Sequence, residues 1–430
     1  MTLTGASILL RAERDPALSR LVPAATRAAA ASGASVYLVG GCVRDLLLKT
    51  RLKDVDLAVE GDARAFAAAL AAALHGRVMA ASEFGTYRVE DAPGTRIDVA
   101  MARRESYAGP AALPRVVAAG IAEDLLRRDF TINSMAIRLS GPGGVELIDP
   151  SGGRGDLSRR ILRLHHPLSL VDDPTRAFRA ARYAARFGLR LAPSWAGALA
   201  HADHHRSFQR ISAARLGREI ALMWLEPDPG AAAHWAAGKG LFTRAGLPVR
   251  WSRALGSALR RTPAILRARD GDTGSALFFA ILLESMSSRV RSRAGKRIGL
   301  HGTLRAGILA AASAAHRGGS IPGGKIGREQ RLDPRFVERV ALWPTLTFNA
   351  VHACGPSRTR ILLDRCRVAW ERSRPLLTGS DLMALGVPEG PRVGAILRAL
   401  RRARLEQTVR DRAGEAALVR RLGSRNRAGS

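Results

Sequence analysis

The spacing of hydrophobic positions changes along the chain near residue 150. Before that point, short apolar or alternating runs at 36–39, 55–59, 77–80, 84–90 and 95–101 have the length of strands, and residues 15–32 and 63–74 have helical spacing. After a glycine-rich segment at 148–157, which we interpret as a hinge, apolar positions keep helical spacing to the end of the chain. The pattern therefore predicts an α+β first part, which contains a sheet, and an all-helical remainder.

Two glycines, Gly40 and Gly41, follow the first apolar run, which ends at Val39. Glycine allows a sharp turn and a close approach of the backbone to a ligand. The apolar positions that follow have helical spacing, and a helix that begins at such a turn directs free N–H groups and partial positive charge outward. Arg44 lies in the first turn of this helix and adds a forked cationic donor. The segment predicts a phosphate cradle.

Two carboxylates come next along the chain. Asp54 and Asp56 are two residues apart at the second predicted strand. Residues i and i+2 of a strand face the same side, and paired carboxylate oxygens suit Mg²⁺. Each motif has an ordinary alternative, a simple turn for the glycines and a solvated strand end for the aspartates. Their succession in this order favours a site for Mg²⁺ and a nucleoside triphosphate.

Asp98 alternates with apolar residues in a later predicted strand, so it is a candidate for the same cleft. There it would serve as a general base or as a further metal ligand. An ordinary half-exposed strand residue is an equally good interpretation, and the sequence leaves both open.

Charged residues interrupt two later segments. Residues 102–114 are basic and contain glycine and proline, which predicts a loop that is able to move. Arg127, Arg128 and Asp129 are consecutive charges beside apolar positions. Burying such charges is costly unless they meet a ligand or one another. A triphosphate and the hydroxyls of a sugar would satisfy them.

Residues 172–188 predict one helix, with acids and a proline at its start and Gly188 after its end. Arg176, Arg179 and Arg182 recur every third residue and form a slowly drifting stripe on this helix. A solvated face is the ordinary explanation of such a stripe. Asp173, however, lies one turn before Arg176, and an acceptor beside a forked donor can bind the Watson–Crick edge of a base.

The composition of the chain predicts a polyanionic binding partner. The 430 residues contain 68 Lys+Arg against 37 Asp+Glu, a net charge of +31, and 47% of residues are hydrophobic. A shortage of acids of this size indicates nucleic acid as the partner. Only three cysteines occur, in a pattern that suits neither a disulfide framework nor a zinc site, so we expect a reducing, cytoplasmic environment. Neither a signal peptide nor a membrane span is predicted.

Four segments in one order resemble the signature motifs of a known family. Val39 to Asp56, Arg127 to Ala136, Ile148 to Leu157 and Asp172 to Gly188 are similar to successive motifs of the bacterial class II tRNA nucleotidyltransferases. That family includes CCA-adding enzymes, CC-adding and A-adding relatives and bacterial poly(A) polymerases. The resemblance is dense over about the first 220 residues and resumes at Leu377 to Leu405. One position departs from it, because Asp172 stands where the family motif normally has glutamate.

The resemblance implies a polymerase-β-like nucleotidyltransferase head with a mixed sheet at residues 1–150. It also implies a helical neck with a base-selecting helix at 151–250, a helical body at 251–330 and a helical RNA-binding tail at 331–430. The implied partners are the tRNA acceptor stem and 3′ end, CTP and ATP, with neither a membrane nor a stable protein partner.

The resemblance also assigns roles to residues. Asp54 and Asp56 would bind catalytic Mg²⁺, and Gly40, Gly41 and Arg44 would hold the triphosphate. Arg127 and Arg128 would bind the nucleotide, with Asp129 near its ribose. Asp173 and Arg176 would select the base, supported by Arg179 and Arg182.

The implied function is template-independent addition of CCA to tRNA 3′ ends. Poly(A) synthesis and the addition of CC or A alone are alternatives on the same fold. A non-catalytic RNA-binding protein, or a nucleotidyltransferase that acts on a small molecule or a protein, are alternatives of other classes. The absence of a His-Asp dipeptide argues against an added metal phosphohydrolase module.

Overall fold

The structure, a computed structural model, describes residues 15–50, 52, 55–82, 85–140, 145–267, 274–317 and 332–424. The chain divides into two compact units, Met1–Pro248 and Val249–Ser430. All strands of the described residues belong to the first unit, and the described part of the second unit is helical. The predicted fold class is confirmed. The finer division at residues 150, 250 and 330 stays a prediction.

A seven-stranded mixed sheet forms the base of the first unit, in the order β3-β4-β5-β2-β1-β8-β9. β2 and β5 are parallel and the other neighbours are antiparallel. The parallel register sets Asp56 beside Asp98, so the two side chains leave the sheet on the same face. The strands are β1 Ser35–Val39, β2 Val55–Glu60, β3 Arg77–Ser82, β4 Thr86–Glu90, β5 Arg96–Met101, β8 Ala136–Ser140 and β9 Leu147–Ile148.

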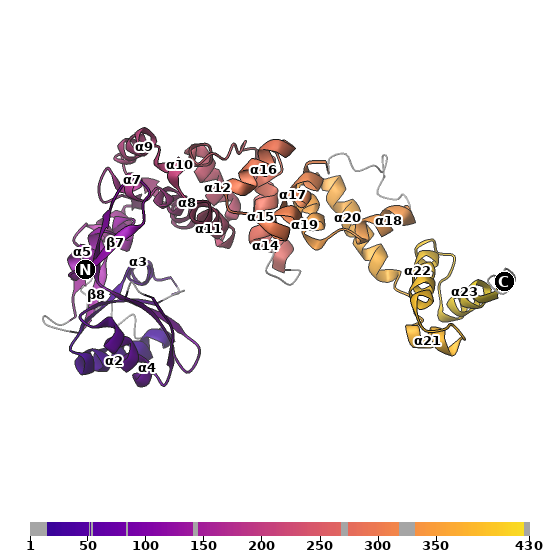
Figure 1. Ribbon diagram of the computed structural model, residues 1–430, viewed down its shortest axis with the longest axis horizontal. Helices are drawn as coiled ribbons and strands as arrows, with labels where there is room; N and C mark the ends of the chain where they lie inside the picture. Colours follow the sequence, from indigo (N-terminus) through magenta and orange to yellow (C-terminus); the bar gives the residue numbers. More distant parts are fainter. Residues whose placement is uncertain are drawn as a thin grey trace. The chain divides into compact units, whose positions relative to one another are not determined.

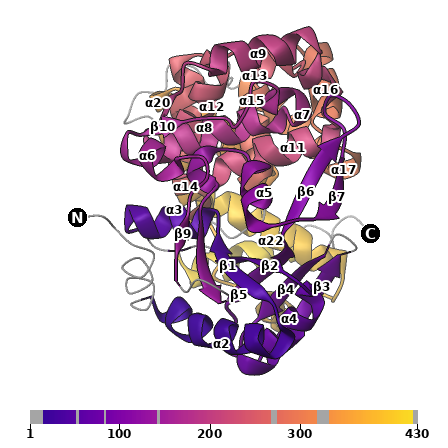
Figure 2. The ribbon, with the colours of Figure 1, turned by 90° about the vertical axis from the view of Figure 1, so that its left-hand side faces the viewer.

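Strand β1 is buried on both faces, as its uninterrupted apolar run predicts. Tyr37 and Val39 pack with residues of α5 (Ile121–Leu126) on one side. The alternate residues of β1 face the opposite side, where α2 (Pro16–Ser32) and α4 (Ala63–Ala73) pack against each other (Figures 1 and 2). The sheet is therefore a rigid base for α3 (Gly41–Leu48), which begins directly after β1.

The predicted loop at residues 102–114 was wrong in its first half. β6 (Arg103–Tyr107) and β7 (Pro114–Ala118) form an antiparallel hairpin, and only the segment between them is irregular. The basic residues of the segment suggested a solvated loop. In the structure Arg103 and Glu105 pair with each other, and their ion pair allows charged residues to alternate along a strand.

The single helix predicted at 172–188 is interrupted near its start. α7 (Ser169–Asp172) ends before Asp173, which has an extended backbone, and α8 covers Thr175–Phe187. Pro174 explains the break, because proline disfavours a helical conformation of the residue before it. The predicted end is confirmed, since Gly188 caps α8 with a left-handed backbone.

The other elements of the first unit are short. They are η1 Thr131–Asn133, α6 Gly153–Ser158, β10 Ile161–Leu162, β11 Arg190–Leu191, α9 Trp195–His204, α10 Ser207–Arg210, α11 Ala213–Ala221, η2 Leu222–Leu225, α12 Pro229–Gly238 and α13 Leu241–Arg244. Among them, α11 and α12 pack against α8 and hold its position in the unit.

The second unit is organised around α15 (Gly274–Leu283), whose residues from Ala276 to Leu283 are buried. α14, α17 and α19 pack around it (Figure 1). In the described part of the chain, every helix is too short or too polar to cross a bilayer. The remaining helices are α14 Arg253–Arg267, α16 Ser288–Arg297, α17 Gly302–Arg317, α18 Pro334–Ala341, α19 Thr345–Cys354, α20 Ser357–Arg372, α21 Gly379–Ala384, α22 Pro391–Leu405 and α23 Arg412–Ser424.

Close packing between α6 and η1 depends on one glycine. A Cβ at Gly153 would overlap the carbonyl oxygen of Thr131, and because the neighbouring atoms of Thr131 and Ile132 are backbone, no side-chain rotation can relieve the clash. We therefore expect Gly153→Ala to lower the free energy of unfolding of the first unit by about 1–3 kcal/mol, the usual range for overpacking. Gly197→Ala in α9 is the control, because a Cβ there meets nothing within 4 Å. Urea unfolding of both variants checks the prediction, and equal midpoints would contradict it.

A buried histidine predicts how stability changes with pH. The His165 ring bonds Ser134 Oγ at 2.6 Å and Ser151 Oγ at 3.2 Å, and burial together with nearby Arg176 lowers its pKa to about 4. The unfolded chain binds this proton near pH 6.5, so stability is full above that value and falls as the pH drops toward 4. Relative to a His165→Gln variant, we expect the native chain to lose at most about 3 kcal/mol between pH 7 and 4. Parallel stability curves in urea would contradict this.

Candidate functional site

A cavity of about 680 Å³ in the first unit brings the predicted site residues together. It lies where α3, the hairpin β6–β7 and helices α8 and α11 meet. Asp54 lies outside the described residues, and each of the other predicted site residues lines this cavity. The structure thus supports their grouping, while their individual roles stay predictions. They are Gly40, Gly41, Arg44, Asp56, Arg127, Arg128, Asp129, Asp173, Arg176, Arg179 and Arg182.

The glycine turn leaves room for an arginine. Gly40 has a φ of 71° and precedes α3, so it occupies the left-handed region that glycine adopts without strain. A Cβ at this position would lie 2.7 Å from Nη1 of Arg128. Any other residue at position 40 would displace this guanidinium. Both a free helix N-terminus and a cationic donor therefore face the cavity at the same point, as an anion-binding site requires.

Arg44 is buried, and its contacts link its own helix, α3, to residues of other elements that surround the cavity. Its Nε donates to Asp45 at 2.8 Å and its Nη1 to Asn133 Oδ1 at 2.6 Å. The guanidinium also lies over the rings of Phe187 and Tyr183, with 4.6 and 5.3 Å to their centroids. Arg44 thus connects α3 to α8. The sequence interpretation missed these partners because they come from distant segments.

Asp124 holds the two adjacent arginines, although it was not among the predicted site residues. Its Oδ1 accepts from Nη2 of Arg127 at 2.6 Å, and its Oδ2 accepts from Nη2 of Arg128 at 2.9 Å. Burial alone would raise the pKa of Asp124, but the two guanidinium groups outweigh burial and lower it. A buried carboxylate at this place keeps both arginines oriented toward the cavity.

Asp129 is a second buried carboxylate. It accepts from Asn133 Nδ2 at 2.9 Å and pairs with Arg179 at 3.0 Å. Burial opposes its ionisation, yet Arg179 and the hydrogen bond from Asn133 lower its pKa. It is therefore ionised at neutral pH, and its partner belongs to the arginine stripe of α8.

The arginines of α8 do not form a solvated face, which was the alternative interpretation of their spacing. Arg176 is buried, and its Nη2 donates to the carbonyl oxygen of Arg127 at 2.8 Å. Arg182 and Arg186 share the buried Glu226, with Nε–oxygen distances of 2.9 and 2.6 Å. These side chains are held in place before any ligand arrives, which lowers the entropic cost of binding.

The sequence interpretation also missed residues that complete the cavity. The hairpin β6–β7 contributes Arg103, Glu105 and Tyr107, and α11 contributes Arg215. The alternation of polar residues at 103, 105 and 107 was the available signal. In total nine arginines and five carboxylates line the cavity, an excess of four positive charges that suits a nucleoside triphosphate.

Metal binding rests on a small set of oxygen donors. Asp56 is half-buried on β2 at the cavity wall, and its backbone N–H points to Cys42 Sγ at 3.2 Å. Asp98 instead forms a two-point ion pair with Arg88, at 2.7 and 3.1 Å, and does not line the cavity. The described residues contain no group of three or more metal-binding side chains. A carboxylate beside an arginine-lined anion cradle fits Mg²⁺, whose remaining ligands come from phosphate and water.

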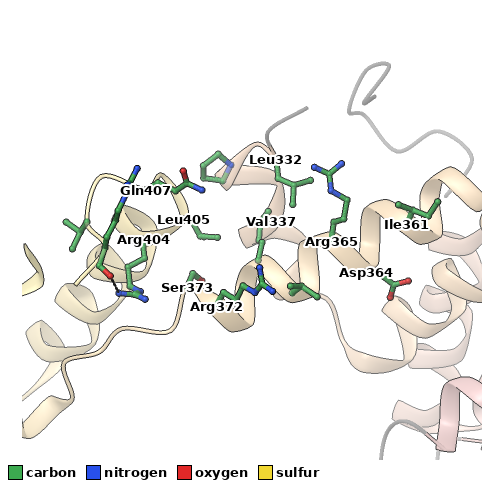
Figure 3. A pocket seen from close by; sticks show the side chains of 15 residues that line it. Leu332, Val337, Ile361, Asp364, Arg365, Arg372, Ser373, Arg404, Leu405 and Gln407 are labelled. Atoms are coloured by element: carbon green, nitrogen blue, oxygen red, sulfur yellow. Dashed lines mark hydrogen bonds between the residues drawn. The ribbon is translucent and has the colours of Figure 1, made fainter. Parts of the chain in front are cut away.

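The second unit has a larger hollow of about 910 Å³ between α18, α20 and the end of α22 (Figure 3). Leu332, Val337 and Leu405 point into it, together with Arg365 and Arg372. None of the predicted site residues lines it. The carboxylate and the anion cradle lie in the smaller cavity, so we place the chemistry there.

Comparison with known proteins agrees with this placement. Residues 36–163 match the poly A polymerase head domain family. The chain is 40% identical over 198 residues to the A-adding tRNA nucleotidyltransferase of Halalkalibacterium halodurans, covering 45% of this chain and 46% of that one. It is 40% identical over 215 residues to the CC-adding tRNA nucleotidyltransferase of Deinococcus radiodurans, covering 47% and 54%. The chain thus spans about half the length of these curated relatives.

Structural similarity extends over both units. A solved structure of a CCA-adding enzyme in an apo form has a TM-score of 0.79 and 26% sequence identity, covering 98% of this chain and 99% of that chain. The head-domain match, the curated relatives and this whole-chain likeness agree with the four ordered motifs. Residues 36–163 therefore match the poly A polymerase head domain, and over both units the chain is similar in structure to a CCA-adding enzyme.

Proposed function

We propose that this chain adds C and A residues from CTP and ATP to tRNA 3′ ends without a nucleic-acid template. One observation carries the proposal: a single cavity with an excess of positive charge is lined by a glycine cradle with Asp56 and also by Asp173 and Arg176. The first group suits a triphosphate and its metal, and the second suits the edge of a base. The names of the related proteins support tRNA as the acceptor.

Binding of the triphosphate is assigned to the cradle. The N–H groups at the start of α3 and the guanidinium of Arg128 face the cavity together, and they would neutralise phosphate oxygens. Asp129, held by Asn133, would accept a hydrogen bond from a ribose hydroxyl. These contacts orient the α-phosphorus, and orientation is the main contribution of a protein to phosphoryl transfer.

Asp56, together with Asp54, would hold Mg²⁺. The ion would supply activation of the RNA 3′-hydroxyl and stabilisation of charge on the leaving pyrophosphate. The 3′-hydroxyl loses its proton to water as its oxygen forms a bond to the α-phosphorus. The bond from the α-phosphorus to the oxygen that bridges it to the β-phosphate breaks, and pyrophosphate leaves. The arginines of the cavity then face the negative charge that accumulates on the pyrophosphate.

Base selection is assigned to Asp173 and Arg176. Two donors of Arg176 are bound to the carbonyl oxygens of Arg127 and Ser169, and a guanidinium has further N–H groups for a base. Cytosine and adenine both present an amino group next to a ring nitrogen that accepts a hydrogen bond. A carboxylate and a guanidinium match this pattern, and uracil and guanine present the reverse.

The proposal is tested with three tRNA transcripts, which end before CCA, before CA and before A. Each transcript is incubated with Mg²⁺ and one labelled nucleotide at a time, and the 3′ ends are then sequenced after reaction with mixed nucleotides. We expect two C residues and one A in order. Addition of CC alone, of A alone or of many A residues would identify the partial enzymes or a poly(A) polymerase.

Absence of incorporation into each of the transcripts would overturn the proposal. If tRNA still bound, with an affinity that falls steeply with salt, the non-catalytic RNA-binding alternative would replace it. Transfer of a nucleotide to a small molecule or to protein, without transfer to tRNA, would support the remaining alternative.

A further inference from the structure

The carboxylate of Asp173 is held by one of its two oxygens. Oδ1 accepts from the backbone N–H of Thr175 at 3.0 Å, from its Oγ1 at 2.6 Å and from Nη2 of Arg215 at 2.7 Å. Among the described residues, Oδ2 has no hydrogen-bond partner. Three donors on one oxygen fix the rotation of the carboxylate, and they leave the other oxygen as an acceptor.

Arg215 has a second acceptor in the turn between β6 and β7. Its Nη1 donates to the carbonyl oxygen of Ala111 at 3.2 Å. Ala111 has a φ of 60°, a left-handed conformation that is unfavourable for a residue with a Cβ. The N–H of Ala111 donates to the carbonyl oxygen of Val171 at 2.9 Å, so the turn is held from both sides.

One side chain therefore joins three elements of the cavity. Arg215 comes from α11, Asp173 lies between α7 and α8, and Ala111 lies at the tip of the hairpin that reaches toward α7 and α11 (Figure 2). The same hairpin contributes Glu105 and Tyr107 to the cavity wall. The orientation of the predicted base acceptor and the position of the hairpin both depend on this guanidinium.

We propose that Arg215 is a positioning residue that sets base discrimination by fixing the Asp173 carboxylate and the β6–β7 turn together. This inference rests on the proposed function. With Oδ1 occupied, Oδ2 stays an acceptor in a fixed direction, which admits the amino group of cytosine or adenine. If uracil or guanine entered instead, Oδ2 would face the carbonyl oxygen of the base, and two hydrogen-bond acceptors repel each other. Without Arg215 the carboxylate rotates, and the discrimination of cytosine and adenine from uracil and guanine weakens.

The test compares Arg215→Ala, Arg215→Lys and the control Arg218→Ala. Arg218 lies on the same helix and is exposed, and its side chain has no hydrogen-bond or ion-pair partner among the described residues. kcat and KM are measured for CTP, ATP, UTP and GTP with the tRNA transcript that the native protein extends. For Arg215→Ala we expect KM for the accepted nucleotides to rise about tenfold and their preference over UTP and GTP to fall at least about tenfold. kcat should stay within about threefold, and the control should match the native protein.

Arg215→Lys keeps the charge but reaches only one of the two acceptors, so we expect an intermediate preference. Thr175→Val provides a second variant with the same shape, and it removes one donor from Oδ1. We expect it to lower the preference by less than Arg215→Ala does. It keeps the inference testable if Arg215→Ala does not fold.

Two results would overturn the inference. One is an unchanged preference and KM in Arg215→Ala and Thr175→Val. The other is a fall in kcat and in thermal stability that is equal for the four nucleotides, because a purely structural role would produce it. Failure of the native protein to incorporate any nucleotide is a separate outcome, which would reject the proposed function rather than the role of Arg215 within it.

Discussion

Replacing Asp56 by asparagine is expected to reduce nucleotide incorporation into tRNA by about a thousandfold or more. The substitution keeps the shape of the side chain and removes the negative charge that would hold Mg²⁺ at the cavity wall. A loss of about 4 kcal/mol in transition-state stabilisation corresponds to this factor. The measurement is single-turnover incorporation of labelled CTP and ATP, with tRNA binding followed in parallel. We expect tRNA binding to stay within about twofold, because affinity for nucleic acid comes mostly from phosphate contacts.

Asp98→Asn is the matched control. Asp98 lies in register with Asp56 on the neighbouring strand, but its carboxylate is paired with Arg88 and does not line the cavity. We expect this variant to keep its activity, which would settle the two interpretations of Asp98 that the sequence leaves open. Full activity of Asp56→Asn would remove the carboxylate from the mechanism. Equal losses in both variants would instead place Asp98 at the metal.

The second large effect is expected at Asp124, the buried carboxylate that pairs with two arginines of the cavity. We expect Asp124→Asn to lower the free energy of unfolding of the first unit by about 3–5 kcal/mol, because it leaves Arg127 and Arg128 without their shared counter-charge. Both arginines line the cavity, so the KM for nucleotides should also rise. Denaturant unfolding and nucleotide kinetics measure the two effects.

Glu123→Gln provides the control from the adjacent position. Glu123 also pairs with an arginine, Arg104, but both side chains are exposed, at 48% and 64%. An exposed pair contributes at most about 1 kcal/mol, so its removal should change little. Similar losses in the two variants would contradict the assignment of the effect to burial.

The effect of Asp124→Asn should also depend on pH. The folded-state pKa of Asp124 is lowered from its ordinary value of 3.8. The stabilisation is therefore complete above that value and is lost as the pH falls through the folded-state pKa. We expect the difference between the native protein and the variant to shrink in acid, and a constant difference would argue against the ionised pair.

Local features of the first unit were predictable because their signals lie close together in the sequence. The turn at Gly40 and the helix after it are as predicted, and so is the left-handed cap at Gly188. Asp62 caps α4 by accepting from the N–H groups of Arg64 and Ala65, as its place before an apolar helix indicates. Each of these features depends on the conformation of a few consecutive residues.

The two errors in secondary structure have a common origin. The hairpin β6–β7 was interpreted as a loop because charged residues in a strand need partners, and the sequence does not show that Glu105 pairs with Arg127. The break at Asp173 was missed because helical periodicity continues on both sides of Pro174. In both cases the prediction used the local sequence pattern alone, whereas the secondary structure also depends on contacts that this pattern does not show.

The sequence by itself determined the strand–glycine–helix cradle, the succession of carboxylates and arginines and the excess of positive charge. These properties follow from backbone preferences and from composition, which act over a few residues or over the whole chain. Only the tertiary structure decided that the arginines of α8 face a cavity and that Glu226 holds two of them. It also decided that Asp124 holds Arg128 and that Arg215 reaches Asp173. Pairing between segments tens of residues apart leaves no periodic signal, because it depends on how the elements pack around the sheet.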